Sequence, residues 1–160
     1  MSEKKSNQSY RHIWSILCQS SSIDRDTNRL SLSNVLEEIT LKQLGDQAAM
    51  KEKDTLHSQK PTGIPFDFEI VSVLERLDDK DKGPLTKEAE LEFIDPQGNS
   101  LLKKNFEMNF LKGFKRLRYR IKMNGLQITI NGTYQFSLRM RESKDSSFEE
   151  VAKLPLDIKF

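Results

Sequence analysis

The chain has 160 residues, of which 36% are hydrophobic and 31% are charged, and its formal net charge at pH 7 is +2. This length suits one domain with a hydrophobic core, and the composition excludes a chain that is disordered throughout. No apolar run approaches the roughly 20 residues that a membrane-spanning helix requires, so the sequence predicts a protein without a membrane segment.

The N-terminal region and the cysteine content indicate the compartment. Residues 1–12, MSEKKSNQSYRH, contain charges but lack the apolar stretch of a secretory signal. Cys18 is the single cysteine, so it cannot form an internal disulfide, which fits a reducing compartment. We therefore expect a cytoplasmic protein, in which residues 1–10 form a flexible polar tail and residues 11–160 form one domain.

Two strands are predicted at the beginning of this domain. Residues 12–18, HIWSILC, are apolar on both parities, which is typical of a strand covered on both sides, with Trp14 buried. Residues 24–28, DRDTN, favour a turn, and a second strand begins at Arg29. Its apolar phase slips by one residue at residues 33–34, which indicates a bulge or a bend.

Residues 42–64, KQLGDQAAMKEKDTLHSQKPTGI, interrupt the strand pattern. Their apolar residues are too sparse for an amphipathic helix, so the segment is predicted to be a long, polar, mobile loop insertion. Beyond it, apolar residues recur with a period of two, as in half-buried strands. Six further strands are predicted, at residues 66–73, 88–93, 104–110, 116–123, 134–141 and 152–160. Pro155, in the last of them, favours an edge position.

About eight strands without a well-patterned long helix predict an all-β fold, in which two antiparallel sheets pack as a sandwich. In residues 131–134, NGTY, Tyr134 follows Gly132 by two residues and enters a strand. This spacing is similar to the tyrosine corner of immunoglobulin-like sandwiches, whose hydroxyl bonds to upstream backbone. We therefore expect an immunoglobulin-like sandwich in which Tyr134 ties the preceding loop to the sheet.

The order of several strand sequences carries a resemblance: IWSILC, RLSLSNVLEEITL, PFDFEI, AELEFIDPQGN and GTYQFSL. The series resembles small bacterial immunoglobulin-like β-sandwich proteins of a family of unknown function. It covers most of the chain, from Trp14 to Ile158, and the insertion 42–64 departs from it. The resemblance implies an immunoglobulin-like fold and a bacterial or phage source. It implies no active site, because its motifs are structural.

The stretch KGFKRLRYRIKMNG, residues 112–125, is basic and contains no acid. Its cations Arg116, Arg118, Arg120 and Lys122 share one parity, and its apolar residues share the other. Strict alternation predicts the solvent face of an ordinary strand, and such cations also protect edge strands from unwanted pairing. The alternative is a polyanion site for a phosphate backbone. Tyr119, on the inward parity, is not available for base stacking, so we favour the first interpretation.

The candidate metal ligands do not form a convincing site. Residues 24–28 resemble the beginning of a calcium loop, but Arg29 takes the place of the glycine and Val35 that of the bidentate glutamate. His12 and His57 have no Cys or carboxylate at ligand spacing, which argues against zinc and against a histidine-based triad. The sequence therefore predicts no metal and no cofactor.

The catalytic candidates have structural interpretations. Cys18 lies in the most apolar strand, which favours a small core residue over a nucleophile. Glu88, Glu90 and Glu92 alternate along one strand and are predicted to form an outward row in water rather than an acid–base pair. We therefore expect no enzymatic activity.

These observations together predict a non-catalytic protein-interaction module that presents loops or an edge strand to a protein partner. The insertion 42–64 is the expected docking or ordering segment. The alternative function is binding of a nucleic-acid backbone through the cations of residues 116–122.

Overall fold

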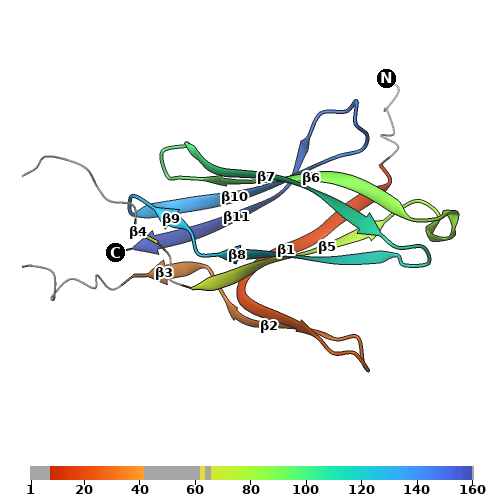
Figure 1. Cartoon of the computed structure of the whole chain (residues 1–160), viewed down its shortest axis with the longest axis horizontal. Coiled ribbons are helices and arrows are strands. Elements are labelled where there is room, and N and C mark those ends of the chain that lie inside the picture. The colour runs from red at the N-terminus through yellow and green to blue at the C-terminus, as the bar shows by residue number, and fades with distance from the viewer. Residues whose placement is uncertain (1–7, 42–61, 64–65, 160) are drawn as a thin grey trace, which may run out of the picture.

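The computed structural model describes residues 8–41, 62–63 and 66–159. Two sheets lie face to face in it (Figure 1). The first sheet contains, in spatial order, β2 (Leu30–Val35), β1 (Tyr10–Ile23), β5 (Asp67–Arg76) and β8 (Arg116–Asn124). The second contains β3 (Glu38–Thr40), β11 (Glu149–Lys159), β10 (Gly132–Arg141), β6 (Leu85–Ile94) and β7 (Ser100–Phe110).

Three short elements complete the described chain. β4 (Thr62–Gly63) pairs with β9 (Gln127–Ile128), and a single 3-10 turn, η1 (Lys80–Lys82), connects β5 to β6. Neighbouring strands are antiparallel except for β3 and β11, which run parallel. The prediction of an all-β protein built from two sheets is thus confirmed. Within the described ranges, no helix is long and apolar enough to span a bilayer.

The core lies between the two sheets, because alternate side chains of both sheets point inward. Phe68 of β5 meets Phe136 of β10 edge to face, with ring centroids 5.9 Å apart. Phe93 of β6 stacks on Phe136 at 4.5 Å and on Tyr134 at 5.2 Å. All four rings are almost completely buried, so these contacts add aromatic pairing to the free energy of apolar burial.

β5 is buried on both of its faces, and the β1–β2 hairpin (residues 19–35) covers its outer face. Val71 and Val73 point away from the second sheet and are nevertheless 0% and 5% exposed. Arg120 of β8 donates to the Ser21 carbonyl at 3.2 Å, and Arg118 donates to the Asn28 carbonyl at 2.8 Å. Because β8 and β1 flank β5 in the sheet, the hairpin must cross over β5 to receive these bonds (Figure 1).

The chain changes sheets between β2 and β3, where the apolar phase slips. Asn34 adopts a positive φ of 52°, and the amide of Leu36 donates to the Leu17 carbonyl in the first sheet. The next carbonyl, that of Glu37, accepts from the Asp157 amide in the second sheet. The predicted bend is confirmed, and its physical reason is the transfer of the chain from one sheet to the other.

The structure changes two details of the predicted first strand. β1 begins at Tyr10, which is 2% exposed, so the assignment of residue 10 to a flexible tail is wrong; residues 1–7 lie outside the described residues. Trp14 is half-buried rather than buried. β2 pairs with β1 only from Cys18 onward, so no described strand lies beside Trp14 on that side of β1.

The predicted insertion and the predicted edge residue can be placed only in part. Within the insertion 42–64, Thr62–Gly63 form β4, and the remainder lies outside the described residues. Pro155 has Gln135 of β10 on one side. On its other side β3 reaches only as far as Asp157, so among the described residues Pro155 occupies an edge position.

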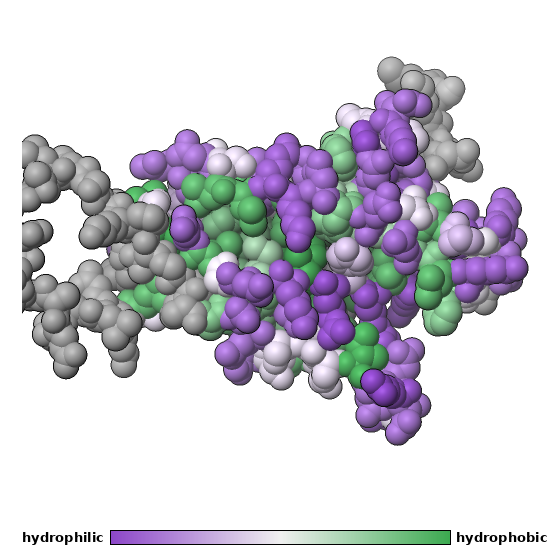
Figure 2. Space-filling model, viewed as in Figure 1, coloured by the Kyte–Doolittle hydropathy of each residue, from purple (hydrophilic) through white to green (hydrophobic). Residues whose placement is uncertain are grey.

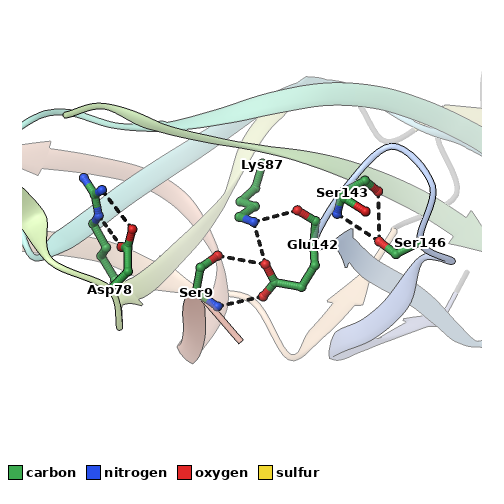
Figure 3. A network of polar contacts seen from close by, with 7 residues as sticks. Ser9, Asp78, Lys87, Glu142, Ser143 and Ser146 are labelled. Carbon is green, nitrogen blue, oxygen red and sulfur yellow. Dashed lines mark hydrogen bonds and ion pairs between the residues drawn. The ribbon is translucent and has the colours of Figure 1, made fainter. Parts of the chain in front are cut away.

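A polar network seals the end of the sandwich where β1 begins (Figure 3). The Lys87 ammonium donates to the carbonyl of Glu142 at 2.6 Å and to its carboxylate at 2.5 Å. The amide and hydroxyl of Ser9 donate to the same carboxylate at 2.9 and 2.8 Å. Burial alone would raise the pKa of Glu142, but the bonds from Lys87 and Ser9 outweigh it and lower that pKa. The network satisfies a lysine that is only 6% exposed.

Candidate functional site

One open side of the described sandwich lies between β7 and β8. Each is the last strand of its sheet, and among the described residues neither has a strand partner on its free side. Residues 111–115 connect them as a turn, so the two edges lie on the same side of the sandwich (Figure 1). An edge strand presents unpaired backbone N–H and C=O groups, which natural proteins usually protect.

A groove of about 480 Å³ separates these two edges. Its apolar walls come from Phe93, Leu102, Met123 and Leu126, and the cations Lys104 and Lys122 stand at its rim. We call this set of six residues the edge groove. Figure 2 shows it as a green, apolar area between rows of purple, hydrophilic side chains. The edge groove therefore combines an apolar surface with two free strand edges and positive charge.

The edge groove closes where the side chains of β7 and β8 meet. Phe106 of β7 stacks on Tyr119 of β8, with ring centroids 5.3 Å apart and an angle of 14° between the rings. Burial raises the pKa of Tyr119 above its ordinary value of 10.0. Tyr119 points inward, as the alternation of this strand predicts, and it bridges both halves of the core. The open length of the groove thus lies beside the second half of β8.

The four cations of the predicted polyanion site have two different environments. Arg118 and Arg120 hold the β1–β2 hairpin through the backbone bonds given above, and Arg118 also donates to the Asn28 side chain at 2.9 Å. The side chains of Arg116 and Lys122 are exposed and make no ion pair or hydrogen bond with the described part of the chain. The structure therefore places the four cations on one face but uses two of them internally. Sequence reasoning missed this internal role.

The segment from β7 to β8 is strongly positive. Residues 100–124 contain eight basic side chains and one acidic side chain, Glu107. Lys103 pairs with Glu90 at 3.1 Å, and Lys115 pairs with Glu75 at 3.2 Å. Lys104, Lys112, Arg116 and Lys122 have no ion pair among the described residues. The edge groove is therefore bordered by positive charge that the described chain does not neutralise.

The acidic row on β6 differs from its prediction. Glu88, Glu90 and Glu92 point outward, but Glu90 is only 5% exposed and does not lie beside open water. Arg139 of β10 contacts Glu90 at 3.3 Å and Glu92 at 3.1 Å, and Arg141 pairs with Glu88. Cross-strand pairs of opposite charge stabilise a sheet, so this row is part of a charge ladder.

Tyr134 makes the contacts that a tyrosine corner requires. Its hydroxyl donates to the Ile130 carbonyl at 2.9 Å and accepts from the amides of Thr129 and Ile130 at 3.1 and 3.2 Å. Gly132 has a φ of 140°, and a Cβ atom there would lie 2.9 Å from the Pro96 side chain. This corner fixes the loop that borders one end of the edge groove, because Thr129 also lines the groove.

A partly buried histidine–serine chain was not foreseen from the sequence. His12 Nε2 lies 2.8 Å from the hydroxyl oxygen of Ser15, which lies 2.7 Å from that of Ser72. Burial lowers the pKa of His12, so the ring is neutral at pH 7. The hydrogen-bonded chain ends on Ser72, and within the described residues the His12 ring makes no hydrogen bond or ion pair with a carboxylate. The arrangement satisfies polar groups inside the core.

The remaining candidates have local roles. Asp24 accepts hydrogen bonds from the amide and hydroxyl of Thr27 at 2.6 and 2.8 Å, which lower its pKa and fix the turn of the β1–β2 hairpin. Cys18 is completely buried, and burial raises its thiol pKa, with the charge of Glu69 adding to the effect. The described residues contain no group of three metal-ligand side chains. His57 lies outside them.

Comparison of the chain with models of known protein families and with curated proteins found no match.

Proposed function

We propose that the protein is a non-catalytic protein-interaction module of the cytoplasm, which binds an extended segment of a partner protein along the edge groove. The observation that carries this proposal is the coincidence of two free strand edges with an apolar groove between them. In strand addition, the partner backbone bonds to an open edge and alternate side chains enter adjacent pockets. The edge groove offers both of these elements.

The scaffold is proposed to be immunoglobulin-like and related to the bacterial or phage sandwich proteins that the sequence resembles. Two observations support this assignment: the bonds of the Tyr134 hydroxyl to upstream backbone, and the packing of two sheets around one core. A rigid sandwich of this kind holds an edge strand in a fixed geometry, which lowers the entropy that binding costs.

Selection from a displayed library of random peptides tests the proposed function. Peptides selected on the wild-type protein are expected to lose about tenfold or more in affinity for Leu102→Asp, because a carboxylate in the groove is desolvated by an apolar ligand. Leu102 is 38% exposed, so the change is compatible with folding. Phe114→Asp is the matched control, since Phe114 is 60% exposed and lies outside the groove. Selected peptides that bind both variants equally would refute the edge groove as the binding site.

Nucleic-acid binding is the competing function, and the unpaired charges of Arg116 and Lys122 favour it. Because Arg118 and Arg120 already hold the β1–β2 hairpin, few cations of this face are left for phosphates. We expect no measurable binding of a single-stranded oligonucleotide at about 50 mM salt, the most favourable condition for such contacts. Tight binding that weakens in Arg116→Gln and Lys122→Gln would support the nucleic-acid function instead.

A further inference from the structure

The two free edges of the groove are not equivalent, and their charges identify the partner. Resting on the proposed function, we infer that the incoming strand pairs with β8, and that it is a segment in which acidic and apolar residues alternate.

The outer face of β8 carries two cations, Arg116 and Lys122, that form no ion pair with the described residues. Across the sheet, Arg116 lies opposite Glu75 and Lys122 lies opposite Glu69 on β5. However, Glu75 is paired with Arg11 and Lys115, and Glu69 accepts from the Ser21 hydroxyl. A strand added on the free side of β8 would place its own outward residues beside Arg116 and Lys122. Carboxylates at those positions would form cross-strand ion pairs.

β7 offers a less suitable edge for the same strand. Its outward residues along the paired stretch are Lys103, Asn105 and Glu107. Lys103 already contacts Glu90, and Glu107 would repel an acidic strand. Lys104 is on the inward parity of β7 and faces the groove instead. An acidic strand would therefore form more favourable ion pairs with β8 than with β7.

The inward residues of a strand on β8 would lie over the edge groove. Strands in a sheet are about 4.8 Å apart and stacked sheets about 10 Å apart, so an added strand covers the space between the β8 edge and the second sheet. Leu102 and Met123 would then contact its apolar side chains. The Phe106–Tyr119 stack limits this contact to the second half of β8.

The molecule already holds a strand of this composition. In β6, Glu88, Glu90 and Glu92 alternate with three core residues, and their carboxylates contact Lys103 of β7 and Arg139 and Arg141 of β10. An acidic–apolar strand thus pairs with basic strands in this fold. β8 presents the same kind of basic face, and in the described part of the chain no strand pairs with its free edge.

A second copy of this chain is a poor occupant of the β8 edge. Antiparallel pairing of β8 with itself would bring four cations from each copy onto one face of the joined sheet, and like charges opposite each other are destabilising. The positive edge therefore disfavours self-association and favours an acidic partner from another protein.

Synthetic peptides with blocked ends test the inference: one alternating Glu and Val, one alternating Gln and Val, and one alternating Lys and Val. By fluorescence anisotropy at about 50 mM salt, we expect the Gln peptide to bind about tenfold more weakly than the Glu peptide, and the Lys peptide to bind more weakly still. Backbone amide signals of Arg116–Asn124 are expected to shift more than those of β7 when the Glu peptide is added.

Variants and a backbone-modified peptide separate charge from strand addition. The double variant Arg116→Glu/Lys122→Glu is expected to prefer the Lys peptide over the Glu peptide. Lys112→Glu is the matched control, since Lys112 is exposed in the turn and outside β8, and it should retain the wild-type preference. A Glu peptide methylated on alternate backbone nitrogens keeps its charge but loses donors, and it is expected not to bind.

The outcomes distinguish this inference from the proposed function. Equal binding of the Glu and Gln peptides would overturn the acidic partner. Amide shifts confined to β7 would overturn the choice of β8. Both results would leave the protein as a strand-binding module. Undiminished binding of the methylated peptide would overturn strand addition itself. If none of the peptides binds the wild-type protein, the inference fails, and the library selection on the edge groove decides the proposed function separately.

Discussion

Phe106 and Tyr119 stack with their ring centroids 5.3 Å apart, and this contact joins the free edges of the two sheets. The two rings fill the space between β7 and β8 at this position. Removing the ring of Phe106 should lengthen the edge groove and lower the free energy of unfolding.

We expect Phe106→Ala to lower the free energy of unfolding by about 2–3 kcal/mol, because a half-buried aromatic ring and its stacking contact are lost. Urea denaturation measures this change. Phe114→Ala, at a ring that is 60% exposed, should alter it by less than about 0.5 kcal/mol. Equal effects of the two substitutions would contradict a closing role for the Phe106–Tyr119 stack.

Tyr134→Phe should destabilise the protein by about 1–3 kcal/mol, because the partly buried amides of Thr129 and Ile130 lose their acceptor. The ring packing on Phe93 remains, so the loss reports on the hydroxyl alone. Amide hydrogen exchange at Thr129 and Ile130 is expected to accelerate more than at Leu138, in the middle of β10. Unchanged exchange at the two loop amides would count against the tyrosine corner.

Gly132→Ala tests the close approach of the Tyr134 loop to Pro96. The substitution strains a backbone at φ 140° and places a Cβ atom 2.9 Å from the Pro96 ring, so we expect a loss of about 2 kcal/mol or more. Gly98→Ala is the control, because Gly98 also has a positive φ, of 89°, but a Cβ atom there meets nothing within 4 Å. Thermal unfolding of both variants should show the larger decrease for Gly132→Ala.

The Glu142 network should make stability depend on pH. Its hydrogen bonds hold the pKa of Glu142 below the ordinary value of 4.5. The carboxylate therefore contributes stability that is present above pH 4.5 and lost as the pH falls through the lowered pKa. Glu142→Gln should be less stable than the wild type at pH 7, and the difference should shrink on acidification. Glu107→Gln is the control at an exposed site, and its free energy of unfolding should equal that of the wild type at every pH. A difference that is constant with pH would refute this role.

Arg118 should act as a clamp on the β1–β2 hairpin. Losing the bonds of Arg118 to Asn28 is expected to destabilise the hairpin locally by about 1 kcal/mol and to speed trypsin cleavage at Arg25 and Arg29. We expect Arg118→Gln to be cleaved faster than Arg116→Gln, whose native side chain makes no bond to the hairpin. Cleavage at the same rate in both variants would refute the clamp.

The sequence contains enough local pattern to predict the strands, the two-sheet core and the contacts of Tyr134. Each of these depends on residues that are neighbours along the chain, or on a period of two that decides which side chains point inward. Residues 66–73 were expected to form a half-buried strand, whereas β5 is buried on both faces, with Ile70 and Val71 both 0% exposed. The sequence pattern did not indicate that the β1–β2 hairpin provides the outer cover.

The edge groove could not be predicted, because the order of strands within a sheet is a nonlocal property. An alternating strand such as β8 has the same pattern in the middle of a sheet as at its edge. The His12–Ser15 contact was hidden for a different reason. Residues three apart in a regular strand lie on opposite faces, and only the bulge between His12 and Trp14 brings these two side chains to the same face.

Ser9 and Glu142 are 133 positions apart in the sequence, yet they touch at the start of the first strand. During synthesis on the ribosome, β1 can pair with β2 early, but its first residues remain without their final contacts until the segment near Glu142 has emerged. A fold dominated by such distant contacts forms slowly, and its early strands stay exposed to other nascent chains. A chaperone that shields β1 during translation would therefore be expected to raise the yield of native protein.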